Sequence, residues 1–276
     1  MNNHASESGH FYYPDGRPCY TIVGKNGKER NTTKKDAKKL GLYPGVTTIT
    51  GEAHSDGLLY YKVNQAIEAA LTLPRHEGEN SADYIKRVRH DAKEHARIRA
   101  EEGTAIHAYL QQLFEGKLLD WTYPSVAMET IHECYKAAAA EIIEKIGVQE
   151  WECEKSFGRE VYLNFRSIGF GGKVDLHNDT YLLDIKSKEG SLGDVKLYDN
   201  HLAQLAAYRV GLYLNNVNCL NNVRCGILFV STNMTAKLVM ADGKDINRGW
   251  RMFRALLGYW YSKYKFEGVG QKEVTK

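Results

Sequence analysis

The chain has 276 residues, with 37 Lys and Arg against 34 Asp and Glu, so its formal net charge is only +3. A chain of this length can bury one substantial core, and so small a charge means that any nucleic-acid-binding surface must be local. Five scattered cysteines form no Cys-x-x-Cys pair, which excludes a disulfide-rich scaffold. We expect a cytoplasmic protein, neither secreted nor spanning a membrane, with a disordered tail at 1–10 and one domain over 11–276.

The first part of this domain, 11–147, is predicted to be a hairpin followed by helices. Turn residues at 14–16 and 26–27 indicate a small hairpin within 19–33, and a short helix over 33–41 should end at Gly41. The segment Leu-Tyr-Pro-Gly-Val-Thr-Thr-Ile-Thr follows at 42–50. Apolar periodicity then predicts helices over 57–73, 80–115 and 124–146.

The helix predicted over 80–115 carries the most concentrated basic run of the chain. Against Asp91 and Glu94 it sets Lys86, Arg87, Arg89, Lys93 and Arg97. Such a run is either a solvated helix face or a track for a phosphate backbone. Because it leads directly to His107, we predict that it binds nucleic acid.

The second part, 148–276, is predicted to be a sheet with helices. Strands are expected over 148–158, 160–176, 180–187, 224–232 and 235–241, and helices over 201–214 and 248–264. This order favours an α/β fold of the α+β type, with a mixed central sheet flanked by helices and covered by the helical N-terminal half. An aromatic stripe in the last helix, including Trp250 and Trp260, indicates core packing, with a base-stacking platform as the alternative.

Two acidic residues and a lysine end the predicted strands around the turn at 177–180. Asp184 and Lys186 share one strand face, and hairpin pairing would bring Asp175 beside them. Two carboxylates on one face favour a divalent cation that prefers oxygen ligands, Mg²⁺ or Mn²⁺, and the backbone carbonyl of Ile185 is a third candidate ligand. Lys186 would orient or deprotonate an attacking water, and the sequence leaves both roles open.

Other polar residues stand at suggestive spacings around this hairpin. His107 follows Gly103 by four residues, although a lone histidine on an apolar helix face is usually a structural core residue. Gln204 and Tyr208 lie one helical turn apart. In the preceding strand Glu150, Glu152 and Glu154 alternate, so any of them could point inward or all could face solvent.

Taken in order, these motifs resemble the PD-(D/E)XK nuclease superfamily, and in particular its RecB-like exonuclease branch. The Val-Thr-Thr segment with Thr47 and Thr48 is similar to a Pro-Ser-Val-Thr-Thr segment of phage and mitochondrial members, with Gly45 in place of the serine. The resemblance covers roughly 100–210. It implies a restriction-endonuclease-like core, one or two Mg²⁺ or Mn²⁺ ions, and the metal ligands His107, Glu154, Asp175, Asp184 and the Ile185 carbonyl.

By the same resemblance the catalytic residues are Asp175, Asp184, Lys186, Gln204 and Tyr208. Gln204 and Tyr208 would brace the lysine and touch the phosphate, and Thr47, Thr48 and Tyr208 would contact DNA. An imidazole ligand would shift the preference somewhat towards Mn²⁺. No cysteine follows Cys225, so no iron–sulfur cluster is expected, and without a phosphate-cradling glycine loop no bound nucleotide is expected either.

The implied activity is a metal-dependent DNA exonuclease that acts on ends or single strands, in phage-type recombination, replication or genome processing. Its partner would be DNA, with a homo-oligomer or a recombination or replication protein as further possibilities. The alternatives are a structure-specific endonuclease and a nucleic-acid-binding protein that uses the fold without turnover.

Overall fold

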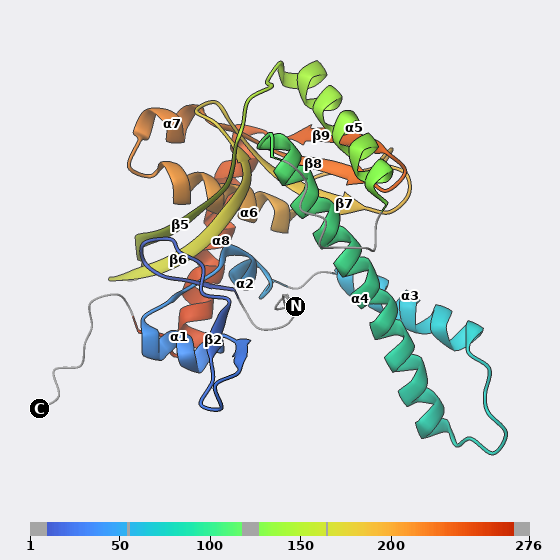
Figure 1. Ribbon diagram of the computed structural model, residues 1–276. Coiled ribbons are helices and arrows are strands. Elements are labelled where there is room, and N and C mark those ends of the chain that lie inside the picture. The colour runs from blue at the N-terminus through green and yellow to red at the C-terminus, as the bar shows by residue number, and fades with distance from the viewer. Residues whose placement is uncertain (1–9, 54–55, 118–126, 164, 268–276) are drawn as a thin grey trace, which may run out of the picture.

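A five-stranded mixed sheet forms the centre of the computed structural model, which describes residues 10–53, 56–117, 127–163 and 165–267 (Figure 1). The strands lie side by side in chain order: β5 (Glu152–Leu163), β6 (Arg166–His177), β7 (Tyr181–Lys188), β8 (Arg224–Ser231) and β9 (Thr235–Met240). The β7–β8 pair is parallel and the other three pairs are antiparallel. The predicted mixed sheet with flanking helices is therefore confirmed. The predicted tail, apart from residue 10, lies outside the described residues.

Helices cover both faces of this sheet. On one face lie α6 (Asp199–Tyr213) and α8 (Gly243–Lys263), and on the other lie α5 (Met128–Ile146) and the C-terminal half of α4 (Ser81–Phe114). Side chains of β8 alternate between the two cores, since Ile227 packs towards α6 and α8 while Leu228 packs towards α4 and α5. Trp260 of α8 is fully buried, so the aromatic stripe serves core packing as predicted.

The β5–β6 hairpin is longer at its tip than predicted. A strand break was expected near Gly158, but β5 continues to Leu163, which pairs with Arg166. Gly158 has another reason to lack a side chain, because a Cβ there would overlap the backbone of Pro14. The glycine thus permits a close approach of the N-terminal segment and does not mark a turn.

Residues 10–53 form a small unit, here called the N-terminal module, which packs on β6. Its elements are β1 (Phe11–Tyr12), β2 (Thr21–Val23), β3 (Glu29–Asn31), α1 (Lys34–Leu40), β4 (Tyr43–Pro44) and α2 (Val46–Thr50). The predicted hairpin and the short helix are both confirmed: Thr33 caps the start of α1, and Gly41 ends it with a φ of 65°. The β1–β4 pair and α2 carried no recognised signal in the sequence.

A helical arm projects from the other side of the molecule (Figure 1). It consists of α3 (Asp56–Thr72) and the N-terminal half of α4, which pack against one another. At 34 residues α4 is about 50 Å long, so only its C-terminal half reaches the sheet. The short α7 (Val217–Asn222) leads into β8. Among the described residues, no helix combines the length and apolar character needed to cross a membrane.

Candidate metal centre

The site lies where β6 and β7 separate. Their ladder has only two pairs, Leu176–Leu183 and His177–Leu182. Beyond these pairs, the Asp175 side chain provides the next hydrogen bond between the strands. Asp175 Oδ2 accepts a hydrogen bond from the Ile185 backbone N–H at 2.7 Å. Because the N–H and C=O of a strand residue point to the same side, the Ile185 carbonyl, a predicted ligand, is directed towards the same opening.

His107 reaches this opening from α4. Its Nε2 lies 2.8 Å from Asp175 Oδ2. The helix can lie this close because Gly103, one turn earlier, has no side chain; a Cβ there would lie 2.6 Å from Ser187 Oγ on β7. The predicted mechanical role of Gly103 in helix–sheet approach is thus supported by the geometry.

Glu154 enters from β5 through an irregular backbone. The β5–β6 register is continuous, but the pair that would join Glu154 to Asp175 is missing, and Glu154 adopts a φ of 54°. Left-handed backbone at a non-glycine residue costs about 1–3 kcal/mol and is concentrated at functional sites. Only 15% of the Glu154 side chain is exposed, against 71% for Glu152. The structure thus selects Glu154 as the inward carboxylate.

Both strands change face at this irregularity. Phe157 and Val174 belong to the core beneath α6 and α8, whereas Cys153 and Leu176 pack into the core beneath α4 and α5. In a regular strand residues of equal parity would share one face. The site therefore occupies the point where the β5–β6 ribbon turns over, which simple alternation cannot predict.

Asp184 and Lys186 lie on the α6 side of the opening. Lys186 Nζ is 2.8 Å from Asp184 Oδ2, and Gln204 Nε2 donates to Asp184 Oδ1 at 3.0 Å. The same amide nitrogen also donates to the hydroxyl of Tyr208 at 3.0 Å. Gln204 therefore contacts Asp184, the carboxylate that is paired with Lys186.

The charges of this group depend on one another. Burial raises the pKa of Asp175, but His107 and the Ile185 N–H more than offset it, so the net pKa is lowered. The pKa of Asp184 is raised, by burial first and by the charge of Asp175, against the opposing effect of Lys186. Burial lowers the pKa values of His107 and Lys186, yet the neighbouring carboxylates raise both overall. The two buried carboxylates thus have His107 and Lys186 as their neighbouring partners.

Three of the predicted ligands fit a divalent cation. Ligand atoms of His107, Glu154 and Asp175 all lie within 4.8 Å of one another. Glu154 Oε2 pairs with Lys173, while Oε1 is buried without a hydrogen-bond partner among the described residues. An orphaned carboxylate oxygen is costly unless a ligand satisfies it, and one imidazole with two carboxylates suits Mn²⁺ or Mg²⁺. Asp184 adjoins this group but is not part of it.

Sequence reasoning missed two residues beside the site. Lys173, on β6, occupies one oxygen of Glu154, and His201, on α6, lies near Lys186. Burial, with a smaller effect of Lys186, lowers the pKa of His201 to about 4, so the ring is neutral at pH 7. Lys173 could have been suspected from its place two residues before Asp175. His201 carried no comparable signal.

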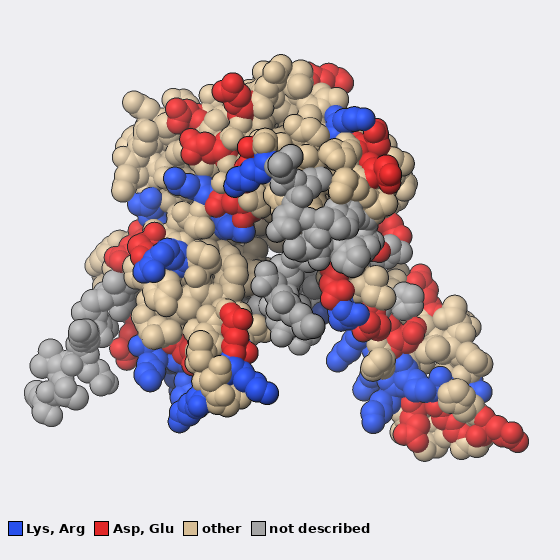
Figure 2. Space-filling model, viewed as in Figure 1, with Lys and Arg blue, Asp and Glu red and all other residues tan. Residues whose placement is uncertain are grey.

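The basic residues predicted on α4 lie on the arm, and two of them already have partners. Arg87 pairs with Glu79 at 2.7 Å, and Arg97 pairs with Glu94 and Glu101. Three others are exposed and make no described ion pair: Lys86, Arg89 and Lys93. Figure 2 shows blue and red side by side along this arm.

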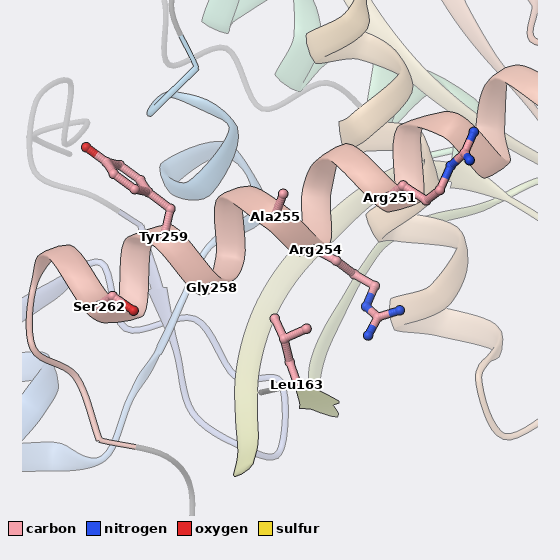
Figure 3. A pocket seen from close by; sticks show the side chains of 7 residues that line it. All are labelled: Leu163, Arg251, Arg254, Ala255, Gly258, Tyr259 and Ser262. Atoms are coloured by element: carbon pink, nitrogen blue, oxygen red, sulfur yellow. The ribbon is translucent and has the colours of Figure 1, made fainter. Parts of the chain in front are cut away.

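The remaining residues predicted to contact DNA differ in exposure. Thr47 is exposed, whereas the Thr48 hydroxyl donates to the backbone carbonyl of His10 at 3.2 Å. Tyr208 is buried behind Gln204. A hollow of about 500 Å³ lies elsewhere, on the outer face of α8 beside Leu163, and is lined by none of the predicted site residues (Figure 3).

Comparisons with known proteins add little. No family model matches the chain, and no curated protein matches its sequence significantly. A candidate exonuclease from Eubacterium rectale is 11% identical, with a TM-score of 0.43 over 59% of this chain and 67% of its own. The protein SSO0001 is 13% identical, with a TM-score of 0.31 over 73% of this chain and 87% of its own. Likenesses this weak leave the functional assignment to the geometry of the site.

Proposed function

We propose that this protein is a metal-dependent DNA nuclease, and an exonuclease that acts on strand ends or single strands. The observation that carries the proposal is the convergence of His107, Glu154 and Asp175 within 4.8 Å, beside the Asp184–Lys186 pair. Imidazole and carboxylate ligands next to an ammonium group suit hydrolysis of a phosphodiester, in which negative charge develops on the phosphate oxygens. The sequence resemblance adds a role in DNA recombination, replication or genome processing as part of the same proposal.

Each residue has a defined task in this proposal. His107, Glu154 and Asp175 hold the cation, with Asp184 and the Ile185 carbonyl adjoining. When bound, a divalent cation supplies positive charge to the phosphate and lowers the pKa of a coordinated water. Lys186, held at 2.8 Å by Asp184, orients the attacking water and adds positive charge beside the phosphate. Gln204 maintains this arrangement by fixing the second oxygen of Asp184.

The exonuclease assignment rests on the position of α4. This helix carries His107 and lies against β7, so it borders the site and limits the room beside it. A free strand end can enter beside such a helix more readily than a continuous duplex. We expect a linear single strand to be degraded much faster than a covalently closed single-stranded circle.

One assay tests the activity. End-labelled and internally labelled DNA is incubated with Mg²⁺ or Mn²⁺, with and without chelator, using wild type, Lys186→Ala and Lys188→Ala. Lys188 is the matched control because it is exposed on the same strand face two residues further on. Cleavage that requires the ion and Lys186 but not Lys188 supports the proposal. Equal cleavage of closed circles would indicate an endonuclease, and DNA binding without any cleavage would indicate a non-catalytic protein.

A further inference from the structure

The N-terminal module carries a local surplus of positive charge. Residues 10–53 contain eight Lys and Arg against four Asp and Glu, a surplus of four. The whole chain has 37 against 34, so 29 cationic residues face 30 acidic ones in the remainder. The positive net charge of the protein is thus concentrated in this short segment.

Four lysines of the module point to solvent without a described partner. Lys25 and Lys28 lie in the β2–β3 turn, and Lys35 and Lys39 lie on α1; all four are exposed. Figure 2 shows blue side chains gathered at the end of the module. We call these four residues the lysine face. Because no described carboxylate neutralises them, their charge remains available to a ligand.

The module's acidic residues are already engaged. Asp15 pairs with Arg17 at 2.8 Å, and Asp36 pairs with Arg30 at 2.7 Å while also capping α1. Glu29 accepts a hydrogen bond from the Thr21 hydroxyl at 2.5 Å, and Glu52 pairs with Lys263 at 2.6 Å. The charges of Arg17 and Arg30 are therefore compensated within the module, and its excess positive charge comes from its lysines.

Two further lysines fix the orientation of α1. Lys34 Nζ lies 3.6 Å from the centre of the Tyr264 ring, and Lys38 Nζ lies 5.2 Å from that of Phe266. These cation–π contacts join α1 to the chain just after α8. The lysine face is thereby held in a defined position on the rest of the molecule.

The arm offers a weaker electrostatic surface. Residues 56–97, which form the arm, have seven Lys and Arg against seven Asp and Glu, so the arm has no net charge. Arg87 and Arg97 are held in ion pairs with glutamates. The lysine face is therefore the stronger site for a polyanion.

The module is rigidly tied to the strand that carries Asp175. Gly45 forms a bridge with Gly171 of β6, and the Tyr12 ring lies directly on Gly171, where a Cβ would approach Tyr12 Cβ to 2.5 Å. Gly171 is four residues before Asp175, about 13 Å along the strand. A strand of DNA that leaves the catalytic opening along β6 would therefore reach the module within a few nucleotides.

We propose that the lysine face binds the phosphate backbone of DNA outside the catalytic centre. This inference rests on the proposed nuclease function and identifies where the substrate is held beyond the cleaved bond. A phosphate backbone suits the face because compact ammonium groups bind phosphates without a requirement for sequence. A membrane surface suits it less well, since Val23 and Leu40 are the only large exposed apolar residues in the described part of the module.

The test measures binding separately from cleavage. A variant with Lys25, Lys28, Lys35 and Lys39 all changed to Gln is compared with a control in which Lys62, Lys136, Lys145 and Lys244 are changed to Gln. The control lysines are exposed on α3, α5 and α8, so both variants lose the same charge. Both are made in the Lys186→Ala background, and binding of a fluorescein-labelled single strand of about 30 nucleotides is titrated in chelator between 50 and 200 mM NaCl.

We expect the module variant to lose at least about tenfold in affinity at 100 mM NaCl, with a slope of log K against log[salt] shallower by about 3. The control should change by less than about twofold. Equal losses in both variants, or no loss in the module variant, would overturn the inference. Loss of binding to vesicles containing phosphatidylserine, with DNA affinity unchanged, would overturn it in favour of a membrane surface.

These outcomes are independent of the nuclease assay. If wild type does not cleave DNA with Mg²⁺ or Mn²⁺ but the module variant still loses affinity selectively, the proposed activity fails and the DNA-binding face stands. If cleavage is present and the two variants bind DNA equally well, the activity stands and the face is wrong.

Discussion

The two sides of the opening between β6 and β7 differ in how many of their carboxylate oxygens have a neighbouring charged or hydrogen-bonding group. On the α4 side, Glu154 keeps one buried carboxylate oxygen without a described partner, on backbone with a φ of 54°. On the α6 side, Asp184 Oδ1 accepts a hydrogen bond from Gln204, and Oδ2, which accepts no hydrogen bond among the described residues, lies 2.8 Å from the Lys186 ammonium group. The first side is arranged to receive a ligand, and the second is arranged to hold an ammonium group in place.

This difference suggests a division of labour within one opening. A buried oxygen without a partner and a residue with strained backbone both lower the stability of the folded protein, and binding of a cation would offset this loss. A carboxylate that is already paired with an ammonium group instead fixes the position of that group before any ligand binds. Substitutions on the two sides should therefore have different effects on metal affinity even where they reduce the cleavage rate equally.

The largest expected effect comes from neutralising either aspartate. Asp175→Asn and Asp184→Asn should each lower the cleavage rate on the order of 10³-fold, because each removes a carboxylate that holds a cationic group, the metal ion or Lys186, beside the phosphate. Titration with Mn²⁺ should separate them, with affinity lost in Asp175→Asn and largely kept in Asp184→Asn. Asp179→Asn, in the exposed turn of the same hairpin, is the control. Equal loss of Mn²⁺ affinity in both variants would contradict the division.

A smaller effect, on metal affinity, is expected from changes at Glu154 and at Lys173, which would compete with a cation for the Glu154 carboxylate. Glu154 Oε2 is paired with Lys173, so a cation must displace this ammonium group. Lys173→Met should raise Mn²⁺ affinity several-fold, whereas Glu154→Gln should lower it by roughly 10–100-fold. Isothermal titration calorimetry measures both. Weaker binding in Lys173→Met would show that the lysine supports the ion site and does not compete with it.

The close packing of α4 against β7 can be tested by substitution of Gly103. A Cβ added there would lie 2.6 Å from Ser187 Oγ but 3.8 Å from Ser187 Cβ. Gly103→Ala should therefore lower the free energy of unfolding by roughly 1–3 kcal/mol, and Ser187→Ala in the same chain should restore most of it. Chemical denaturation of the two single variants and the double variant measures this coupling. Additive effects would mean that the hydroxyl is not the obstacle.

The smallest effect concerns pH on the α6 side. The pKa of His201 is lowered to about 4, from an ordinary value of about 6.5, so the fold favours the neutral ring. Its contribution to stability is complete above pH 6.5 and is lost as the pH falls towards 4, by about 1 kcal/mol after allowing for solvent screening. His201→Asn keeps an acceptor for the Tyr198 N–H and should flatten this part of the stability profile. An unchanged profile would contradict the assignment.

Local signals were sufficient for much of the fold. Capping by Thr33 and Gly41 defined α1, and apolar periodicity located α3, α4 and α8 to within a few residues. These predictions succeeded because the interactions that decide them lie within one or two turns of the chain. The predicted end of β5, at 158, was wrong, because the strand continues past Gly158. This glycine is needed for the close contact with Pro14, which lies more than a hundred residues away in the sequence.

The sequence by itself determined which polar residues lie together at the opening between β6 and β7. Spacing alone put Asp184 and Lys186 on one strand face, and it put Gln204 and Tyr208 on one helix face. Tertiary structure decided which glutamate points inward, because Glu150, Glu152 and Glu154 alternate equally and only the irregular backbone opposite Asp175 distinguishes them. The ion pairs of Arg97, in contrast, join residues three and four positions apart on one helix, a local pattern that the sequence contains. The irregular backbone at Glu154 depends on how β5 pairs with β6, and a linear pattern of residues does not show that pairing.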